Sequence, residues 1–384
     1  MLNIRSTVFW GLDFIKGGVI KKHLKDIEEK NTKAVSTKEK LITLLEHAHR
    51  SVRYYKDIET LEVQHFPVVT KVDIKNNYEG FKSNSFKGKA THTMATSGST
   101  GTHFVIQQDS NKRKRTIAEL IYFNSIAGQR LGQRYMYVKA FPKPKSYMER
   151  LKQNVLPIDI LNLNKEKLEQ IRYLLKRDKS IKSILAYAST YEQLAKYLYE
   201  LGDTPGMFNL NSLFSSSAVL SPETKEKLTK IFGCSIIDRY SNQENGVLAQ
   251  TRDTYSVFYI NKANYHIELL KLDSDEPTKK GEVGRIVVTD LYNFAMPMIR
   301  YDTGDLAISD DDNRENLNTL RNIQGRRVDI IYDTKGNMLT PHTWSVHMRK
   351  YKELKQWQFI QDDKCEYTLK VNGGKGIYTK VDFD

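Results

Sequence analysis

The sequence predicts an α/β protein in which a large domain of mixed or largely parallel sheet with helices precedes a small α+β domain. Through the middle of the chain, apolar strands alternate with amphipathic helices, which is typical of a parallel sheet. After about residue 255 the pattern changes to short strands with turns, which predicts an antiparallel, β-barrel-like subdomain. The length of 384 residues exceeds one typical domain. We expect the large domain over residues 1–327 and the small one, which looks incomplete, over 328–384.

The composition is that of a globular, strongly basic protein. Hydrophobic residues make up 39% and charged residues 28%, and 60 Lys and Arg against 46 Asp and Glu give a net charge of +14. Such a charge suits nucleic acid, an anionic membrane face or anionic small molecules. The basic residues are spread out, however, and the dense run Lys112–Arg115 is interpreted as the solvated start of a helix. We therefore expect no nucleic-acid partner.

Two features indicate the compartment. The two cysteines, Cys234 and Cys365, offer neither a disulfide framework nor a metal-binding set, which fits a reducing cytoplasm. The first twenty residues are mildly apolar, but Arg5, Asp13 and Lys16 interrupt them. We expect a surface helix there rather than a signal peptide or an integral membrane segment, and a peripheral amphipathic helix is the alternative.

The first hundred residues predict helices and one extended segment. The run Ser36–Glu39 has the pattern of a capping box, and Leu41, Leu44, Leu45 and Ala48 follow it at helical spacing. Pro67 makes Phe66–Val69 extended, because proline restrains the residue before it. Thr70–Asp73 can then cap a short helix.

Strands and helices alternate from there on. Strands are expected at Phe104–Ile106, Tyr135–Val138, Ile184–Tyr187 and Leu213–Phe214. Helices are expected from about Arg113 to Ala127 with Gly128 as the stop, over Lys165–Leu175, after a cap at Ser189–Glu192, and from Pro222 to Gly233. The short strands of the second half are expected at Tyr255–Ile260, Tyr265–Leu272 and Gly284–Val288.

The run Ala95–Thr102 is rich in Gly, Ser and Thr and has no bulky side chain. Its glycines let the backbone turn sharply and bring N–H groups close to an anion, and its hydroxyls add donors for phosphate oxygens. It lacks the Gly-Lys-Ser/Thr of the common nucleotide-triphosphate loop and the third glycine of the dinucleotide fingerprint. Taken alone, such a run is more often an ordinary flexible turn.

Two further polar stretches lie much later in the chain. Asp238–Gly246 follows the predicted strand Cys234–Ile237, and polar residues at a strand end sit where α/β folds bind ligands. A carboxylate there can hold a magnesium ion that in turn holds phosphates, although a solvated loop remains the alternative. In Pro297–Asp305, an aspartate fixed by a glycine turn can accept both ribose hydroxyls, although Thr-Gly-Asp is also good hairpin chemistry.

A fourth stretch, Gly325–Asp329, completes a set of four in a characteristic order. Together they resemble the adenylate-forming superfamily of acyl ligases, and most of all its phenylacetate–coenzyme A ligase branch with the capsular-polysaccharide-biosynthesis relatives. Thr96–Gly101 looks like the phosphate loop of that family. Tyr240 through Glu244 is similar to its Tyr-x-x-x-Glu motif, and Arg300–Asp305 to its Arg-Tyr-x-Thr-Gly-Asp motif. Weaker echoes at 66–71 and 355–361 extend the likeness over nearly the whole chain.

The resemblance implies a role for each matching residue. Glu244 would ligate Mg²⁺ and act in catalysis with Thr100, Tyr240 would stack on adenine, and Asp305 would bind the ribose hydroxyls with help from Arg326. Val328 and Asp329 would form the hinge of the small domain. The full set of nucleotide-binding candidates is Thr96, Ser97, Gly98, Ser99, Thr100, Gly101, Ser217, Tyr240, Ser241, Asp305 and Arg326.

The sequence departs from the family pattern at three places. Thr102 and His103 stand where the branch often has a Lys-Pro pair, and Ala218 ends a small-residue run that frequently closes with an acid. Only about 55 residues follow Asp329, against roughly a hundred in the family. Gly373–Gly376 comes too early to be the adenylation Gly-Lys motif and is expected to turn a hairpin between Glu366–Val371 and Ile377–Val381. The chain is therefore either a fragment or a protein without the adenylation lysine.

The function that this resemblance implies is ATP-dependent adenylation of a carboxylic acid, followed by acyl transfer to coenzyme A or another thiol. ATP, Mg²⁺ and coenzyme A would be the cofactors, surface-polysaccharide assembly the setting, and a homodimer is left open. The alternative is a nucleotide-binding protein of the same fold that has lost catalysis and acts as a binding partner. A nucleic-acid-binding protein is suggested by the net charge alone. Tyr122, Phe123, Tyr187 and Phe214 are candidates either for the acyl pocket or for the core.

Overall fold

The computed structural model describes residues 3–33, 36–96, 104–139, 145–160, 163–216, 219–255, 257–324, 331–332, 334, 338–339, 351, 356–364 and 366–372. Ten α-helices lie in these ranges, namely α1 (Ile4–Ile15), α2 (Val19–Thr32), α3 (Lys38–Ser51), α4 (Lys71–Asn76), α5 (Tyr78–Phe81), α6 (Ser110–Ile126), α7 (Tyr147–Gln153), α8 (Lys165–Arg177), α9 (Ala188–Glu200) and α10 (Pro222–Phe232).

Most of the strands join one mixed sheet of eleven strands, in the order β10-β11-β12-β13-β9-β8-β7-β6-β5-β3-β4. Its members are β3 (Arg134–Lys139), β4 (Val155–Asp159), β5 (Ile181–Tyr187), β6 (Ser212–Ser216), β7 (Ser235–Asn242), β8 (Gly246–Gln250), β9 (Phe258–Ile260), β10 (Tyr265–Leu270), β11 (Val283–Asp290), β12 (Tyr301–Ile308) and β13 (Thr319–Gln324). Three hairpins stand outside it: β1 (His92–Thr96) with β2 (Phe104–Gln108), β14 (Ile331–Tyr332) with β15 (Met338–Leu339), and β16 (Gln356–Asp363) with β17 (Glu366–Asn372).

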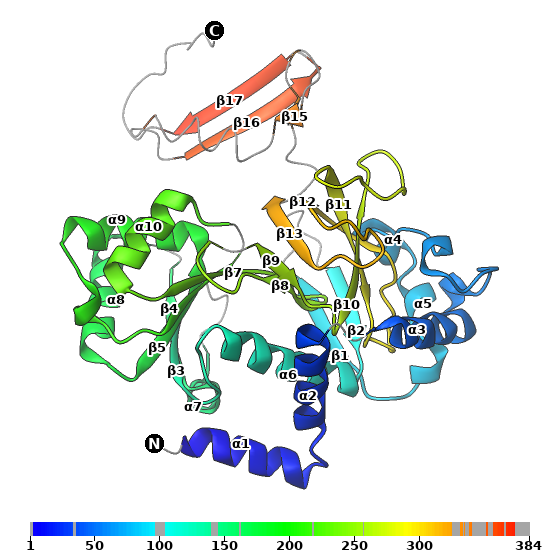
Figure 1. Cartoon of the computed structure of the whole chain (residues 1–384), viewed down its shortest axis with the longest axis horizontal. Coiled ribbons are helices and arrows are strands. Elements are labelled where there is room, and N and C mark those ends of the chain that lie inside the picture. Colours follow the sequence, from blue (N-terminus) through cyan, green and yellow to red (C-terminus); the bar gives the residue numbers. More distant parts are fainter. Residues whose placement is uncertain are drawn as a thin grey trace.

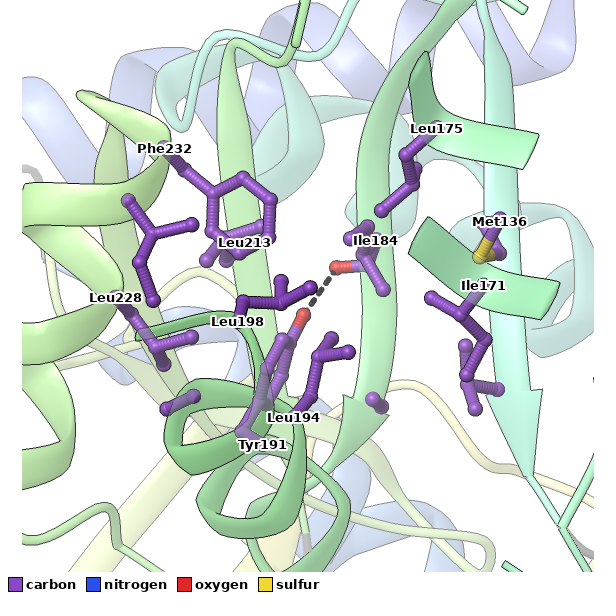
Figure 2. Close-up of a cluster of buried hydrophobic side chains, with 14 of the residues drawn as sticks. Met136, Ile171, Leu175, Ile184, Tyr191, Leu194, Leu198, Leu213, Leu228 and Phe232 are labelled. Atoms are coloured by element: carbon purple, nitrogen blue, oxygen red, sulfur yellow. Dashed lines mark hydrogen bonds between the residues drawn. The ribbon is translucent and has the colours of Figure 1, made fainter. Parts of the chain in front are cut away.

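Strands β3 to β7 form the parallel half of the sheet, as the alternation of strands and helices predicts. Helices α8, α9 and α10 lie together on this side of the molecule (Figure 1). Their apolar faces pack on the strands in the largest cluster of buried side chains, which includes Ile171, Leu194, Leu198, Leu213 and Leu228 (Figure 2). Tyr191 is buried in the same cluster, and its hydroxyl donates to the Ile184 carbonyl at 2.8 Å. Burial of this apolar face is what holds the helices on the sheet.

Strand β7 is the point where the sheet changes character. It runs parallel to β6 and antiparallel to β8, and strands β8 to β13 are all antiparallel. The expected antiparallel subdomain is thus present, but no closed barrel forms among the described residues. Strand β10 ends the sheet on one side, and the antiparallel half continues directly into the parallel half through β7.

A second cluster joins the N-terminal part to the antiparallel half. Leu44, Leu45 and Ala48 of α3 are buried, as predicted from their spacing, and they belong to a cluster with Phe66, Phe104, Met296, Met298, Ile299 and Tyr301. Tyr122, Phe123 and Phe214 are also buried in apolar clusters, so these three belong to the core.

The helix starts show which capping predictions were right. Thr70 caps α4 in a full capping box with Asp73, and Ser221 caps α10, which ends at Gly233 in the left-handed conformation. The predicted caps of α3 and α9 are wrong: neither Thr37 nor Tyr187, the actual N-cap residues, makes a side-chain cap bond. These two helices are instead held by the apolar residues they bury, which outweigh a missing cap.

Helix α6 corrects the interpretation of the basic run. The helix begins at Ser110, with Asp109 as its cap, so Lys112 and Arg115 lie within its first two turns. Both side chains are completely buried rather than solvated. Lys112 pairs with Asp290 at 2.7 Å, and Arg115 pairs with Asp26 at 2.6 Å. Two of the four basic side chains are therefore buried, because each forms an ion pair with an aspartate from a distant part of the chain.

Strand β17 confirms the predicted strand Glu366–Val371. It pairs with the preceding strand β16 in one register from Gln356 opposite Asn372 to Gln361 opposite Tyr367, and the register then shifts so that Asp363 lies opposite Glu366. The predicted partner strand Ile377–Val381 and the turn at Gly373–Gly376 lie outside the described residues. Within the part of the chain that is described, no helix has the length and apolar character needed to cross a bilayer.

Candidate functional site

The first part of the site is the connection between β7 and β8. Strand β7 does not stop at Ile237 but continues to Asn242, so Tyr240 and Ser241 lie in the strand and only 243–245 form the turn. The Asn242 side chain accepts from the Asn245 backbone N–H at 2.8 Å and so closes the turn. The turn places Glu244 beyond the carboxyl end of β7, where the sheet changes from parallel to antiparallel.

Glu244 is a buried carboxylate held by groups from three other segments. The Tyr301 hydroxyl donates to its Oε1 at 3.0 Å, and Lys71 Nζ lies 3.1 Å from the same oxygen. The Gln108 amide donates to the Glu244 carbonyl at 2.9 Å and fixes the backbone. The side chain of Glu244 is 3% exposed, whereas that of Lys71 is 42% exposed. The Oε1 atom of the carboxylate is thus contacted by a buried hydroxyl and by a partly exposed cation.

The second part of the site is the segment Arg300–Asp305, which is a bulged stretch of β12 and not a tight hairpin. Opposite Ile286 the register shifts, and Gly304 has a φ of +80°. The Asp302 carboxylate accepts from the Gly304 N–H at 2.8 Å, while Thr303 Oγ1 accepts from the Asp305 N–H at 3.1 Å. A β-bulge re-aims side chains locally, and here it brings Asp305 to the site.

These two segments meet through a pair of tyrosines. The Tyr240 hydroxyl donates to Asp305 Oδ2 at 2.8 Å and lies 3.2 Å from Thr303 Oγ1. The Tyr301 hydroxyl of β12 in turn donates to Glu244 in the β7–β8 turn. Tyr240, Glu244 and Asp305 therefore lie in one cluster, as the sequence predicts for residues that bind one ligand.

A third segment, Phe66–Lys71, is tied to the second by backbone hydrogen bonds. The Val69 N–H donates to the Arg300 carbonyl at 3.0 Å, and the Asp302 N–H donates to the Val69 carbonyl at 2.8 Å. Arg300 itself is buried, and its guanidinium donates to the Phe66 carbonyl and pairs with Glu268 at 3.0 Å. This pairing places Lys71, the first residue of α4, beside Glu244.

The structure describes the two strands on either side of the Gly/Ser/Thr run, β1 and β2. Thr96 ends β1 and is paired with Phe104, the first residue of β2. The Phe104 ring is stacked on Tyr301, with centroids 6.1 Å apart, and Lys71 Nζ lies 5.7 Å from the Phe104 ring centroid. The strand ends that flank the run therefore adjoin the cluster around Glu244.

Several predicted site residues lie outside the described residues. They are Ser97, Gly98, Ser99, Thr100, Gly101, Thr102, His103, Ser217, Ala218, Gly325, Arg326, Val328 and Asp329. Thr96 is described in its backbone alone. The predicted participation of these residues remains a prediction.

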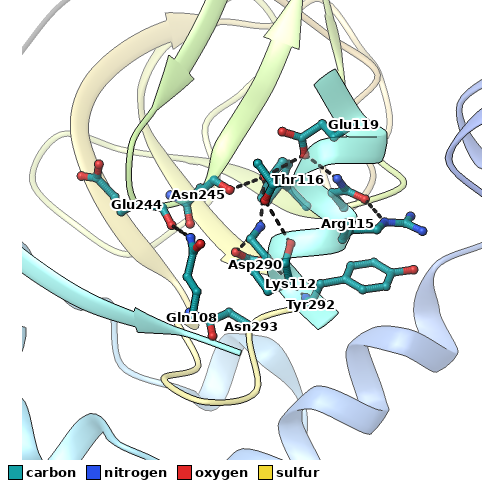
Figure 3. A network of polar contacts seen from close by, with 12 residues as sticks. Gln108, Lys112, Arg115, Thr116, Glu119, Glu244, Asn245, Asp290, Tyr292 and Asn293 are labelled. Carbon is teal, nitrogen blue, oxygen red and sulfur yellow. Dashed lines mark hydrogen bonds and ion pairs between the residues drawn. The ribbon is translucent and has the colours of Figure 1, made fainter. Parts of the chain in front are cut away.

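Behind the β7–β8 turn lies a buried polar network centred on Glu119 of α6 (Figure 3). The Glu119 carboxylate accepts from the Val247 N–H at 2.6 Å and from the Tyr265 hydroxyl at 3.0 Å. The Tyr265 oxygen also lies 2.7 Å from the Asn245 carbonyl oxygen and 3.2 Å from Lys112 Nζ. The network therefore supports the residues that follow Glu244 from within the core.

Gly246 shows how closely this network packs on the turn. Its φ is +130°, a conformation that residues with a side chain rarely adopt. A Cβ there would overlap the Glu119 carboxylate and approach the Tyr265 hydroxyl to 2.8 Å. Glycine is therefore required two residues after Glu244.

Burial governs the ionisation of the two site tyrosines. Burial raises the pKa of Tyr240 well above its usual range, and the Asp305 carboxylate raises it further. Burial likewise raises the pKa of Tyr301, with an added contribution from Glu244. Both hydroxyls are thus protonated donors toward carboxylates at neutral pH.

Other residues of Asp238–Gly246 serve the fold. Asp238 is buried and pairs with Lys225 at 2.6 Å. Arg239 donates to the side chains of Gln250 and Asn124 at 2.7 and 2.8 Å. The polar character of this stretch therefore has two origins, one in the site and one in the packing of β7.

The sequence reasoning missed three residues that contact Glu244, namely Lys71, Gln108 and Tyr301. Lys71 and Tyr301 both lie in stretches that carry the family resemblance, so the motif pattern could have drawn attention to them. Gln108 ends a strand and gives no such signal. Its contact depends on how β2 packs on the β7–β8 turn.

The residues present fit one magnesium ion bound jointly with a phosphorylated ligand. Among the described residues, no hydrogen bond or ion pair reaches Glu244 Oε2, and no group of three metal-ligating side chains gathers. Mg²⁺ is commonly bound by one or two carboxylates together with substrate phosphates, so a single fixed carboxylate suits it.

Comparison with known proteins gives one distant relative by sequence. No protein-family model matches the chain. Protein CapK from Staphylococcus aureus is 25% identical over 325 residues, which is 80% of this chain and 69% of CapK.

Comparison with solved structures identifies the fold. A 2-hydroxyisobutyryl-CoA ligase in the postadenylation state, in complex with R3-HIB-AMP, matches with a TM-score of 0.67 at 17% identity and covers 87% of this chain and 76% of its own. ATP-bound MatB from Rhodopseudomonas palustris matches with a TM-score of 0.50 at 16% identity, over 74% of this chain and 59% of MatB. At these identities the likeness establishes the fold.

Proposed function

Because the chain has the fold of the adenylate-forming CoA ligases, we propose that it activates a carboxylic acid with ATP and passes the acyl group to coenzyme A or another thiol. The observation that carries the proposal is the convergence of Tyr240, Glu244 and Asp305 beyond the carboxyl end of β7. These three residues come from the two stretches that resemble the family motifs. Solved ligases of this fold hold HIB-AMP, CoA or ATP.

The nucleoside end of the nucleotide would lie against Tyr240 and Asp305. Asp305 offers a carboxylate on an ordered bulge, suited to accept two ribose hydroxyls. Tyr240 would stack on adenine, and its hydrogen bonds to Asp305 and Thr303 hold the ring in one orientation. Ser217, Ser241 and Arg326 are proposed as further contacts.

The phosphate end would lie toward Glu244, Lys71 and the run Thr96–Gly101. Bound Mg²⁺ would neutralise phosphate charge, which otherwise repels the attacking carboxylate. Glu244 would hold the ion, and Tyr301 keeps that carboxylate in place. We propose that Lys71 supplies the cation that Thr102 and His103 do not, because its partly exposed ammonium lies 3.1 Å from Glu244.

The finer parts of the proposal concern domains and setting. We propose a large domain over 1–327 and a small domain over 328–384, turning about Val328 and Asp329 so that different groups serve the two half-reactions. The similarity to CapK makes surface-polysaccharide assembly the proposed setting, with the reaction in the cytoplasm.

An ATP–pyrophosphate exchange assay with a panel of aryl and short-chain acids tests the proposal, together with calorimetric titration of AMP. The ligase account predicts acid-dependent exchange and AMP binding. Binding of AMP without exchange for any acid would favour the alternative, a nucleotide-binding protein without catalysis, which the substitutions at Thr102, His103 and Ala218 support. Absence of both would refute the nucleotide site.

A further inference from the structure

The first helix presents a continuous apolar stripe to solvent. Ile4, Val8, Leu12 and Ile15 are all exposed, Ile15 by 80%, and Phe14, which lies outside this stripe, is 82% exposed. At about 100° per residue, these four positions fall within an arc of about 80° on one helix face. A surface helix ordinarily buries such a stripe against the core of its own protein. An apolar stripe that stays exposed marks a surface that binds something else.

The helix is held so that this stripe points away from the body. The Asn3 side chain donates to the Leu131 carbonyl at 2.8 Å, and Arg5 donates to the Leu151 carbonyl at 2.5 Å. At the other end, the buried Asp13 carboxylate accepts from the N–H groups of Ile20 and Lys21 at 3.1 and 3.0 Å. Polar contacts thus hold both ends of the helix, and the half-buried Phe9 and Trp10 lie between them.

Helix α7 adds to the same region. Arg5 joins α1 to α7, which lie near each other at the edge of the molecule (Figure 1). On α7, Tyr147 is 74%, Met148 56% and Leu151 43% exposed. We call the exposed apolar side chains of α1 and α7 the α1–α7 patch.

The charges around the patch have one dominant sign. Arg5, Lys16, Lys21, Lys22 and Lys25 are all exposed, and the one acid among residues 3–25 is the buried Asp13. The exposed acids Glu28 and Glu29 lie further along α2, and on α7 the exposed Glu149 is outnumbered by Arg150 and Lys152. On the helical wheel, Arg5 falls at the edge of the stripe, where it also bonds to Leu151, and Lys16 is the C-cap residue that follows Ile15. An apolar face flanked by lysine and arginine is the pattern of a helix that lies in the interface of a membrane.

We propose that the α1–α7 patch docks this protein peripherally on a membrane surface that carries anionic lipid headgroups. Helix α1 has 12 residues and is about 18 Å long, too short to span a hydrocarbon core of about 30 Å, so it would lie in the plane of the interface. A second copy is a poorer occupant, because a symmetric contact would bring the same five cations of both chains together.

Vesicle flotation of the full chain tests the proposal. Binding is expected to vesicles of phosphatidylcholine with phosphatidylglycerol, to be much weaker to phosphatidylcholine alone, and to fall as salt shortens the Debye length. A Lys21→Gln/Lys22→Gln variant should lose more than about tenfold in partitioning, since each basic residue contributes about fivefold. A Lys165→Gln/Lys167→Gln variant, with the same charge change on α8, is the matched control.

A second pair of variants tests the apolar stripe. Phe14→Ser/Ile15→Ser should lose about tenfold or more in partitioning, whereas Tyr255→Ser, which removes a side chain that is 72% exposed elsewhere, should not. Circular dichroism confirms that each variant is folded. Equal binding to both vesicle types, or unchanged binding of both patch variants, would overturn the proposal. A dimer that the Phe14→Ser/Ile15→Ser variant abolishes would also overturn it, in favour of a second copy.

Discussion

Removal of the Asp305 carboxylate should weaken nucleotide binding far more than it weakens the fold. If Asp305 accepts two ribose hydroxyls, each bond to the charged acceptor contributes about 1.5 to 3 kcal/mol. The structure favours the lower value, because Asp305 already accepts from Tyr240 and the ligand must replace existing contacts. Two bonds then amount to about 3 kcal/mol, or about a 100-fold rise in the Kd for AMP.

The fold itself should change little in the Asp305→Ala variant. Tyr240 keeps Thr303 as a hydrogen-bond partner, so the cost in stability is expected near 1 kcal/mol. Isothermal titration with AMP measures the binding, and thermal unfolding measures the stability. Asp305→Asn keeps one neutral acceptor and should lose about tenfold in affinity.

Asp310→Ala is the matched control, because it removes the same charge from an exposed ion pair with Arg321. Its AMP affinity should stay within about twofold, as expected of a surface pair. If Asp305→Ala changes the Kd by less than threefold, or if Asp310→Ala changes it equally, Asp305 does not bind the ribose and the site assignment is wrong.

Three further predictions concern the surroundings of Asp305. Glu244→Gln should abolish the Mg²⁺ dependence of ATP binding, measured by titration with and without EDTA. The same variant should leave the Kd for AMP within about threefold, because AMP needs no metal bridge. Retained Mg²⁺ dependence would contradict the role of Glu244. Lys112→Met should cost about 3 to 5 kcal/mol in chemical denaturation by leaving Asp290 unpaired in the core, whereas Lys114→Met should cost under 1 kcal/mol. Gly246→Ala should lower the free energy of unfolding by over about 2 kcal/mol and should also lower the affinity for AMP. Gly202→Ala is the control, because Gly202 has a φ of +68° with open space around it, and it should lower the free energy of unfolding by about 1 kcal/mol. Equal losses would show that the Glu119 contact does not constrain the turn.

The convergence of three residues could be predicted from the sequence where local patterns resemble family motifs. Tyr240, Glu244 and Asp305 stand in two such polar stretches, and the structure brings these stretches together, whereas their role toward a nucleotide remains a prediction. The Thr-Gly-Asp stretch was ambiguous for a physical reason. The same glycine conformation and side-chain-to-backbone bonds that close a hairpin also form a bulge, and only the pairing of β12 with β11 decides between them.

Contacts between distant segments could not be predicted in the same way. Lys112 and Arg115 look like solvated charges because nothing near them in the sequence reveals Asp290 or Asp26. A buried ion pair is visible only when both partners and their burial are known. Lys71 was missed for the same reason, because its partner, the Glu244 carboxylate, lies far along the chain.

Arg300 explains how several of these distant contacts are set at once. It has a φ of +49°, which costs a residue with a side chain roughly 1 to 2 kcal/mol. Its backbone carbonyl and guanidinium both hold the segment that leads to Lys71, through the Val69 N–H and the Phe66 carbonyl. The next residue, Tyr301, donates to Glu244.

A single strained position therefore fixes both the cation and the hydroxyl that flank the Glu244 carboxylate. Because Arg300 is 3% exposed and its guanidinium is engaged with Glu268 and two backbone carbonyls, it is a positioning residue rather than a ligand of phosphate. The arginine of this stretch thus sets the geometry of the site, whereas the aspartate five residues later is the one for which we propose a contact with the nucleotide.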